Sequence, residues 1–359
     1  MKASSAGLEM RAAVLSRLDA PLDIVSGIRL TSPGRGQVLV KLAYSGVCHS
    51  QLMEARGQRG ADPYLPHLLG HEGTGKVVEV GEGVTKVKSD DLVILGWIKG
   101  AGLDGGGARY QCDCMTQPIN GGGVTTFNEY ALVSENRIVP LPDGVPLDIG
   151  VLFGCALPTG AGILTNDLRP PPGSSVAIFG LGGIGLSALM ATLLFDCSLV
   201  IAVDVSAEKL DLARAFEATH VIDASLTDPV AMIRTLTDGR GADFAVEASG
   251  QARVIEQAFE SVRRGGGTCV FASHPGQGER ISIDPYELIC GKQIRGSWGG
   301  SSHPDRDTPI FAALYRDGRL PLERLLSKRY PLGSINEALS DLEAKRVARP
   351  LIEIDTTLG

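Results

Sequence analysis

Short runs in which apolar and polar residues alternate dominate the first 160 residues of the chain. Alternation over four to eight residues between Gly and Asp turns predicts half-buried strands. Helical periodicity of comparable strength is confined to short pieces near Gln51–Gly57 and Asp148–Leu152. We therefore expect an antiparallel, β-rich domain whose strands include residues 10–15, 36–47, 73–81, 91–97 and 127–133.

The pattern changes near residue 165, where short apolar runs begin to alternate with helical stretches such as Ala207–Glu217 and Arg253–Val262. Strands that alternate with helices of this length form right-handed βαβ units and a parallel sheet. Six such strands predict a complete doubly wound, dinucleotide-binding fold, with strands at residues 175–179, 199–204, 220–223, 244–248, 268–272 and 294–298.

After about residue 299 the chain returns to short mixed elements and finishes with a strand-like run at 350–354. The expected fold class is α/β, with a doubly wound Rossmann domain inserted into a β-rich domain that is split in the sequence. We place the two parts of the β-rich domain at residues 1–158 and 299–359, and the nucleotide domain at residues 159–298.

Composition excludes several classes of partner. Apolar residues make up 43% of the 359 residues and charged residues 21%, which is ordinary for a globular protein. The net charge of −7 argues against nucleic acid or an anionic membrane as the main partner, since both require a basic face. The uncharged run Val176–Phe195 is long enough to cross a bilayer. It contains four crowded glycines, however, and these favour a strand, a turn and a buried helix.

Cysteine usage and the N-terminal sequence bear on location. Seven cysteines, an odd number without the spacing of a disulfide scaffold, indicate a reducing compartment. The first residues contain no apolar stretch of the length a signal peptide needs. The expected location is therefore the cytoplasm.

A glycine-rich segment fits the dinucleotide fingerprint G-x-G-x-x-G, which is weak alone but here follows an apolar strand and precedes a helix. Its glycines permit a tight turn and close approach of the backbone to a pyrophosphate, and the helix N-terminus offers free N–H groups. Asp204 closes the next strand, where it would bind the ribose hydroxyls and repel a 2′-phosphate, so NAD is favoured over NADP. Lys209 either leans over the same ribose or is an ordinary solvated lysine. The fingerprint residues are Gly180, Leu181, Gly182, Gly183, Ile184 and Gly185.

Cys48, His71 and Cys155 are candidate metal ligands. A lone cysteine is most often a small buried apolar residue, and a lone histidine is most often a hydrogen-bonded polar group. Together, two cysteines and one histidine supply the three protein ligands of a catalytic zinc with an open fourth position. Glu72 could occupy that fourth position when substrate and water are absent.

The motif around His71 completes a known signature, GHE-x₂-G-x₅-G-x₂-V, formed by Gly70, His71, Glu72, Gly75, Gly81 and Val84. From Met10 to its C-terminus the chain resembles the zinc-dependent alcohol dehydrogenases of the medium-chain dehydrogenase/reductase superfamily, in which a Cys₂His zinc site is itself known. The resemblance implies a GroES-like β-rich domain, a homodimer or homotetramer, and reversible oxidation of an alcohol to an aldehyde or ketone with hydride transfer to NAD.

The resemblance also implies roles for individual residues. It assigns the catalytic zinc to Cys48, His71 and Cys155, and the substrate hydroxyl to Ser50. Further contacts with the cofactor are implied for residues that touch the pyrophosphate or flank the nicotinamide: His49, Arg349, Thr159, Ala272, Ser273 and His274.

Three positions depart from the family pattern. Many relatives carry a structural zinc on four cysteines in the lobe after the GHE motif, but here that lobe is Gly-rich and offers only Cys112 and Cys114, so we expect no structural zinc. Gln51 replaces the aspartate that commonly orients the zinc-bound histidine, although its amide oxygen could still accept the imidazole N–H. Met53 stands where some relatives have a relay histidine.

Two alternative functions compete with this interpretation. A zinc-free quinone or enone reductase of the same superfamily would lack Cys48, His71 and Cys155. A non-catalytic NAD(H)-binding protein would fail to turn over any alcohol. The sequence does not identify the alcohol or carbonyl substrate.

Overall fold

The alternating runs and the βαβ pattern fold as two compact units in the computed structural model, which describes residues 7–273 and 275–358. The β-rich unit comprises the chain up to Cys155, His303–Arg316 and the chain from Leu322 onward. The second unit comprises Ala156–Ser302 and Asp317–Pro321. The domain boundaries predicted after residues 158 and 298 stay a proposal.

The β-rich unit contains two sheets. The strand order is β2-β1-β4-β8-β7 in one, and β10-β6-β5-β3-β18-β17 in the other, where β9 also pairs with β3. The strands are β1 (Glu9–Leu15), β2 (Asp23–Arg29), β3 (Gln37–Gly46), β4 (His67–Leu68), β5 (Gly73–Val80), β6 (Leu92–Leu95), β7 (Ala108–Tyr110), β8 (Ile119–Gly121), β9 (Tyr130–Ser134), β10 (Ile138–Pro140), β17 (Arg329–Pro331) and β18 (Leu351–Glu353). Its helices are α1 (His49–Ala55), α2 (Leu147–Gly150), α9 (Pro304–Arg316) and α10 (Ile335–Glu343).

Alternation along β3 explains how the unit forms its core. Val38, Val40 and Leu42 are fully buried in one apolar cluster, whereas Leu39, on the opposite face of the strand, is buried in another. Side chains of a strand point alternately to its two faces, so β3 lies between two apolar layers.

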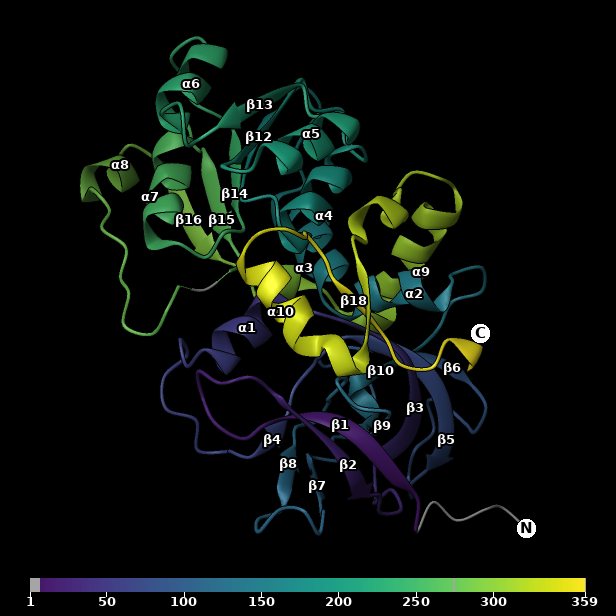
Figure 1. Ribbon diagram of the computed structural model, residues 1–359. Coiled ribbons are helices and arrows are strands. Elements are labelled where there is room, and N and C mark those ends of the chain that lie inside the picture. Colours follow the sequence, from purple (N-terminus) through teal and green to yellow (C-terminus); the bar gives the residue numbers. More distant parts are fainter. Residues whose placement is uncertain (1–6, 274, 359) are drawn as a thin grey trace. The chain divides into compact units, whose positions relative to one another are not determined.

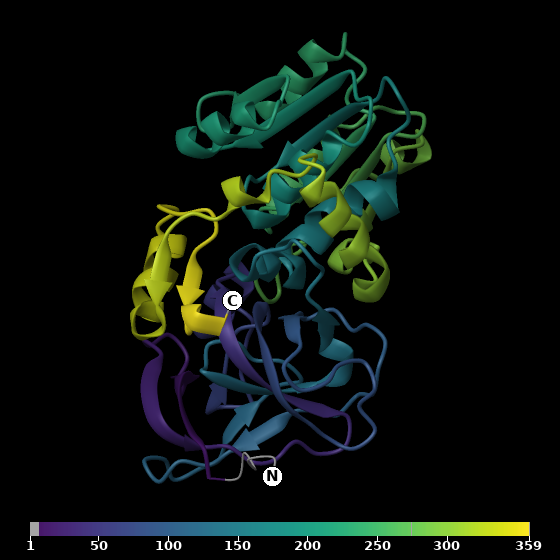
Figure 2. The same ribbon diagram turned by 90° about the vertical axis from the view of Figure 1, so that its right-hand side faces the viewer.

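The C-terminal part of the chain completes this unit. β18 pairs with β3 in antiparallel register, with Ile352 opposite Ser45, and β17 continues the sheet. Figures 1 and 2 show the yellow α10 and β18 beside the purple N-terminal strands of the same unit. Strand pairing therefore joins the N-terminal and C-terminal parts of the β-rich unit into one sheet.

The second unit is a doubly wound Rossmann fold with six parallel strands in the order β13-β12-β11-β14-β15-β16. Helices α4 and α5 cover one face of the sheet and α6 and α7 cover the other (Figure 1). The strands are β11 (Ser175–Phe179), β12 (Leu199–Asp204), β13 (His220–Asp223), β14 (Phe244–Glu247), β15 (Thr268–Phe271) and β16 (Gln293–Gly296). The helices are α3 (Ala156–Gly162), α4 (Gly183–Thr192), α5 (Ala207–Ala215), α6 (Pro229–Leu236), α7 (Ala252–Ser261) and α8 (Pro285–Ile289).

All six parallel strands lie where the sequence predicts them, and the uncharged run Val176–Phe195 contains β11, the glycine turn and α4. Among the described residues, no single helix is both long and apolar enough to cross a membrane. The bent pair Leu147–Gly154 and Ala156–Leu168 passes that test by length and composition alone.

Candidate metal centre and dinucleotide site

Cys48 and His71 are brought together by the pairing of β3 with β5. The register places Ser45 opposite Gly73, so Cys48, three residues beyond Ser45, and His71, two residues before Gly73, lie at the same end of the strand pair. The backbone N–H of Gly46 also donates to the carbonyl of Glu72 at 3.2 Å. Two segments remote in the sequence are thereby held at one point.

Cys155 reaches the same point through a close backbone approach. It follows the 3₁₀-helix Val151–Gly154, and the Trp97 N–H donates to the Gly154 carbonyl at 3.4 Å just after β6. A Cβ added at Gly154 would lie 2.4 Å from the Leu95 carbonyl oxygen. Only glycine therefore allows the segment before Cys155 to approach β6 this closely.

The three predicted ligands converge. The ligand atoms of Cys48, His71 and Cys155 all lie within 4.8 Å of one another, and His71 Nε2 lies 3.3 Å from Cys155 Sγ. Zinc bonds of about 2.3 Å to sulfur and about 2.0 Å to nitrogen, arranged tetrahedrally, require a separation of about 3.5 Å between such atoms. The donor set and its spacing thus fit a zinc ion held by two sulfurs and one imidazole.

The two thiols share one environment but differ in character. A hydrogen bond from Cys155 holds the pKa of Cys48 well below its usual range despite burial, and His71 and Arg349 lower it further. The same hydrogen bond, together with burial, raises the pKa of Cys155. Cys48 is therefore the first of the two thiols to lose its proton. Cysteines bind metal in the thiolate form.

Gln51, buried in the first turn of α1, contacts both His71 and the Cys48 backbone. Its Oε1 accepts the Cys48 N–H at 2.7 Å, and its Nε2 is hydrogen-bonded to His71 Nδ1. The amide oxygen, which the sequence allowed as an acceptor for the imidazole, faces the Cys48 N–H instead, and the amide NH₂ faces the imidazole.

Glu72 and Arg349 form a buried ion pair beside the candidate metal ligands. A Cβ at Gly46 would lie 2.6 Å from Glu72 Oε1, so glycine there leaves room for the carboxylate. Burial lowers the pKa of Arg349, but Glu72, Cys48 and Cys155 together raise it above its usual value. Within the described residues, Glu72 Oε1 and Arg349 Nε have no hydrogen-bond partner. The roles of Glu72 as a fourth zinc ligand and of Arg349 at the pyrophosphate stay predictions.

The remaining predicted residues of the catalytic machinery are placed as follows. Ser50 Oγ and Thr159 Oγ1 are buried without a hydrogen-bond partner among the described residues, which is costly unless a ligand completes them. His49 is exposed at the start of α1, and Met53 is buried on the same helix.

The glycine fingerprint forms the turn between β11 and α4, at the carboxyl edge of the parallel sheet. Gly180 has φ of +84°, and a Cβ at Gly185 would lie 1.8 Å from the Gly180 carbonyl oxygen. Helix α4 starts at Gly183 with Gly182 as its N-cap, so its first N–H groups are available to an anion. The turn lies where the strand order reverses, between β11 and β14, the position at which doubly wound sheets bind nucleotides.

Asp204, the last residue of β12, is tied to this turn. Its Oδ2 accepts the Leu181 N–H at 2.6 Å, and its Oδ1 accepts the N–H groups of Val205 and Ser206. Lys209 Nζ lies 4.0 Å from the Asp204 carboxylate. The predicted nicotinamide segment begins directly after β15 with Ala272 and Ser273, while His274 lies outside the described residues.

Comparison with known proteins decides the family. A family model described as an alcohol dehydrogenase GroES-like domain matches residues 34–143, and one described as a zinc-binding dehydrogenase matches residues 183–314. The chain is 32% identical to an S-(hydroxymethyl)glutathione dehydrogenase from Escherichia coli O139:H28, over 96% of this chain and 100% of that protein. It belongs to the zinc-dependent alcohol dehydrogenases.

Solved structures agree with this assignment. An alcohol dehydrogenase zinc-binding domain protein from Burkholderia ambifaria is similar with a TM-score of 0.87 and 32% identity, covering 96% of this chain and 99% of that one. Benzyl alcohol dehydrogenase from Acinetobacter calcoaceticus gives a TM-score of 0.86 and 30% identity, covering 97% and 99%. The predicted family and the predicted fold, a Rossmann domain with a GroES-like β-rich domain, are confirmed. The chain is an alcohol dehydrogenase of a zinc-dependent family that uses NAD.

The lobe that often holds a structural zinc in this family is organised by side-chain acceptors. Glu135, 1% exposed, accepts the N–H groups of Thr85, Lys86 and Leu103, at 2.7, 2.9 and 2.7 Å. These hydrogen bonds from three positions lower the pKa of Glu135 although burial raises it. One carboxylate thus joins the glycine-rich lobe to the neighbouring turn.

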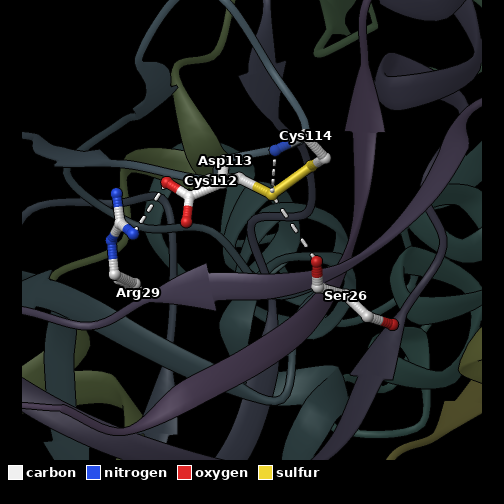
Figure 3. Close-up of a disulfide and its surroundings, with 5 residues drawn as sticks. All are labelled: Ser26, Arg29, Cys112, Asp113 and Cys114. Atoms are coloured by element: carbon white, nitrogen blue, oxygen red, sulfur yellow. Dashed lines mark hydrogen bonds and ion pairs between the residues drawn. A yellow bond between two sulfur atoms is a disulfide. The ribbon is translucent and has the colours of Figure 1, made fainter.

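Cys112 and Cys114 form a disulfide across a single intervening residue, with their Cα atoms 5.2 Å apart (Figure 3). Asp113 between them pairs with Arg29 at 2.8 Å, and the Cys114 N–H lies 3.3 Å from Cys112 Sγ. This pairing differs from the reduced thiols expected of the cysteine count. The two cysteines can pair because one intervening residue places their Cα atoms within the normal separation for a disulfide.

Two polar clusters were not predicted from the sequence. His67, 7% exposed, lies with Nε2 2.7 Å from Asp62 and 3.8 Å from Glu54, while its Nδ1 lies 2.9 Å from the Leu68 carbonyl oxygen. Glu247, the last residue of β14, accepts the Ser249 and Gly250 N–H groups. The members of each cluster lie close together in the sequence, but burial of His67 and Glu247 is decided by the fold.

Burial raises the pKa of Glu247 to about 7, only partly offset by the bonds from Ser249 and Gly250. Because the folded pKa exceeds the unfolded one, its contribution to stability is fully present below about pH 4.5 and is lost as the pH rises through 7. We predict that Glu247→Gln raises the free energy of unfolding, relative to wild type, by about 2–3 kcal/mol more at pH 8 than at pH 5. Urea titrations at both pH values measure this difference.

The exposed Glu208→Gln on α5 is the matched control and should leave the pH profile of stability unchanged. Parallel profiles for wild type and Glu247→Gln would contradict the prediction.

Proposed function

We propose that this chain oxidises an alcohol to an aldehyde or ketone, reversibly, with NAD as hydride acceptor and one catalytic zinc. The convergence of Cys48, His71 and Cys155 carries the proposal. A zinc ion there supplies Lewis-acid polarisation of the substrate oxygen, and the nicotinamide supplies the hydride chemistry. A zinc-free quinone or enone reductase has no use for a buried Cys₂His set, and a non-catalytic NAD(H)-binding protein has no need of one.

Ser50 is proposed to take the proton of the alcohol. Its Oγ is buried and lacks a partner among the described residues, so a substrate hydroxyl would complete its hydrogen bonding. Met53 offers no group for a further transfer along α1. The ribose of a bound nicotinamide, or water, would supply the next acceptor for that proton.

The second unit is proposed to bind and orient NAD. The α4 N-terminus faces the pyrophosphate, and Asp204 accepts from the ribose hydroxyls with Lys209 alongside. Thr159 and the segment from Ala272 flank the nicotinamide, while His49 and Arg349 contact the pyrophosphate. The relatives act on quite different alcohols by name, so a panel of aliphatic, aromatic and polyol substrates would identify the one used here.

A homodimer or homotetramer is proposed for the assembly. β16 ends the parallel sheet, and three of its four residues are exposed. Just beyond it Trp298 is 80% exposed, and an edge strand beside an exposed aromatic can pair with a second copy. Light scattering should return two or four times 37.7 kDa, and a monomer would contradict the proposal. A reducing, cytoplasmic location stays a prediction.

Loss of a metal ligand provides the direct test of the function. Purified wild type should contain about one zinc per chain, and Cys48→Ser should lose that zinc. Turnover should fall about a thousandfold or more, because several kcal/mol of transition-state stabilisation come from the metal. NAD binding should persist, since the fingerprint lies in the other unit.

Elemental analysis, an alcohol-dependent NADH assay and calorimetric NAD titration measure these three quantities. Cys290→Ser changes a free cysteine outside the site and serves as control. Near wild-type turnover in a zinc-free Cys48→Ser enzyme would refute the proposed function.

Cofactor preference depends on Asp204. Removing its charge should lower the ratio of kcat/KM for NAD to kcat/KM for NADP by at least about tenfold. The reason is that the 2′-phosphate of NADP then no longer faces a carboxylate. Asp204→Gly also removes the carboxylate that accepts three backbone N–H groups, those of Leu181, Val205 and Ser206. Asp204→Asn retains the side-chain size and one acceptor oxygen. Its effect on cofactor preference therefore reports the loss of charge rather than a change in the shape of the loop. Equal kcat/KM for both cofactors in wild type would contradict this assignment.

A further inference from the structure

The amide of Gln51 is the only polar group that links the His71 ring to the Cys48 backbone among the contacts described for these residues. Gln51 is 1% exposed, so water does not replace either contact. Its Oε1 accepts the Cys48 N–H at 2.7 Å, and its Nε2 is bonded to His71 Nδ1. Each atom of the amide therefore has one partner.

The Cys48 backbone settles which way the amide points. A backbone N–H can only donate, so the amide oxygen must face it and the amide NH₂ is left for His71. An NH₂ group also only donates, so His71 Nδ1 must present its lone pair. In a neutral imidazole the hydrogen then resides on Nε2.

This tautomer conflicts with metal binding. His71 Nε2 is the nitrogen that faces the cluster, 3.3 Å from Cys155 Sγ, and a metal needs its lone pair. With the hydrogen on Nε2 the ring donates to a cysteine sulfur instead. If the hydrogen of the His71 ring moves to Nδ1, that N–H faces the Gln51 NH₂, and two donors meet without an acceptor. The contact becomes favourable only if the Gln51 amide rotates so that its oxygen faces His71. The turned amide, in turn, leaves the Cys48 N–H without its acceptor.

We propose that Gln51 is a positioning residue that opposes zinc binding, so that loading this site with zinc breaks the hydrogen bond between Gln51 and the Cys48 N–H. A carboxylate at this position would avoid the conflict, because its two oxygens accept the Cys48 N–H and the His71 Nδ1–H together. The inference rests on the proposed zinc site and adds that this chain holds its zinc less tightly than a chain with a carboxylate at residue 51.

Gln51→Glu is the sharpest test because it replaces only the NH₂ by oxygen at the same side-chain length. Zinc affinity is measured on the zinc-loaded enzyme by competition with a chromophoric chelator. The Gln51→Glu enzyme should bind zinc about 10–100-fold more tightly than wild type. The exposed Gln58→Glu adds the same charge beyond the end of α1 and should leave the affinity unchanged. Equal affinities for wild type and Gln51→Glu would overturn the proposal.

A second measurement on wild type needs no variant and separates hydrogen bonding from added charge. After zinc removal, with folding checked by circular dichroism, ¹⁵N spectra of labelled histidine should show the His71 hydrogen on Nε2. Adding zinc should move it to Nδ1 and speed hydrogen exchange of the Cys48 amide. A zinc-free His71 with its hydrogen on Nδ1, or a Cys48 amide equally protected in both forms, would overturn the inference.

The two proposals fail in different ways. A wild-type enzyme that binds no zinc at Cys48, His71 and Cys155 would refute the proposed function. A wild-type enzyme that binds one zinc per chain with the affinity of Gln51→Glu would refute only the role of Gln51.

Discussion

The antiparallel register of β3 and β5 is the constraint on which the metal centre depends. With Ser45 opposite Gly73, the segments after β3 and before β5 must leave the sheet at the same end, which places Cys48 beside His71. A register shift of one residue would move Val38, Val40 and Leu42 to the opposite face of the sheet and out of their apolar cluster. Burial of Val38, Val40 and Leu42 therefore fixes the ligand geometry as well as the core.

Charge balance explains why Glu72 and Arg349 are buried next to the ligands. With zinc bound, two thiolates, a carboxylate, a guanidinium and the divalent cation would together carry no net charge, so the cluster could be buried without an unpaired ion. Glycine at 46 and 154 provides the necessary space, because a Cβ at Gly154 would lie 2.8 Å from that of Glu72. The ion pair and the metal ligands thus form one electrostatic unit within the β-rich part of the chain.

Carboxylates organise both loops at the point where the Rossmann strand order reverses. Asp204 accepts the Leu181 N–H of the glycine turn, and Glu247 accepts the Ser249 and Gly250 N–H groups after β14. Buried acceptors of this kind hold backbone N–H groups in place at the crevice where doubly wound folds bind nucleotides. The two loops at this crevice are therefore prearranged by the protein's own hydrogen bonds.

The sequence by itself determined the fold class, the six parallel strands, the glycine fingerprint and the three candidate ligands that the fold brings together, because these depend on local periodicity and short motifs. Short strands such as β4, β8 and β17 were missed, since two or three residues carry no readable period. The orientation of the Gln51 amide, the Glu72–Arg349 pair, the three donors to Glu135 and the buried Glu247 were decided only by the tertiary structure. Each of these joins segments far apart in the chain or depends on burial, and the orientation of the Gln51 amide follows from the Cys48 N–H that faces it rather than from the residue type alone.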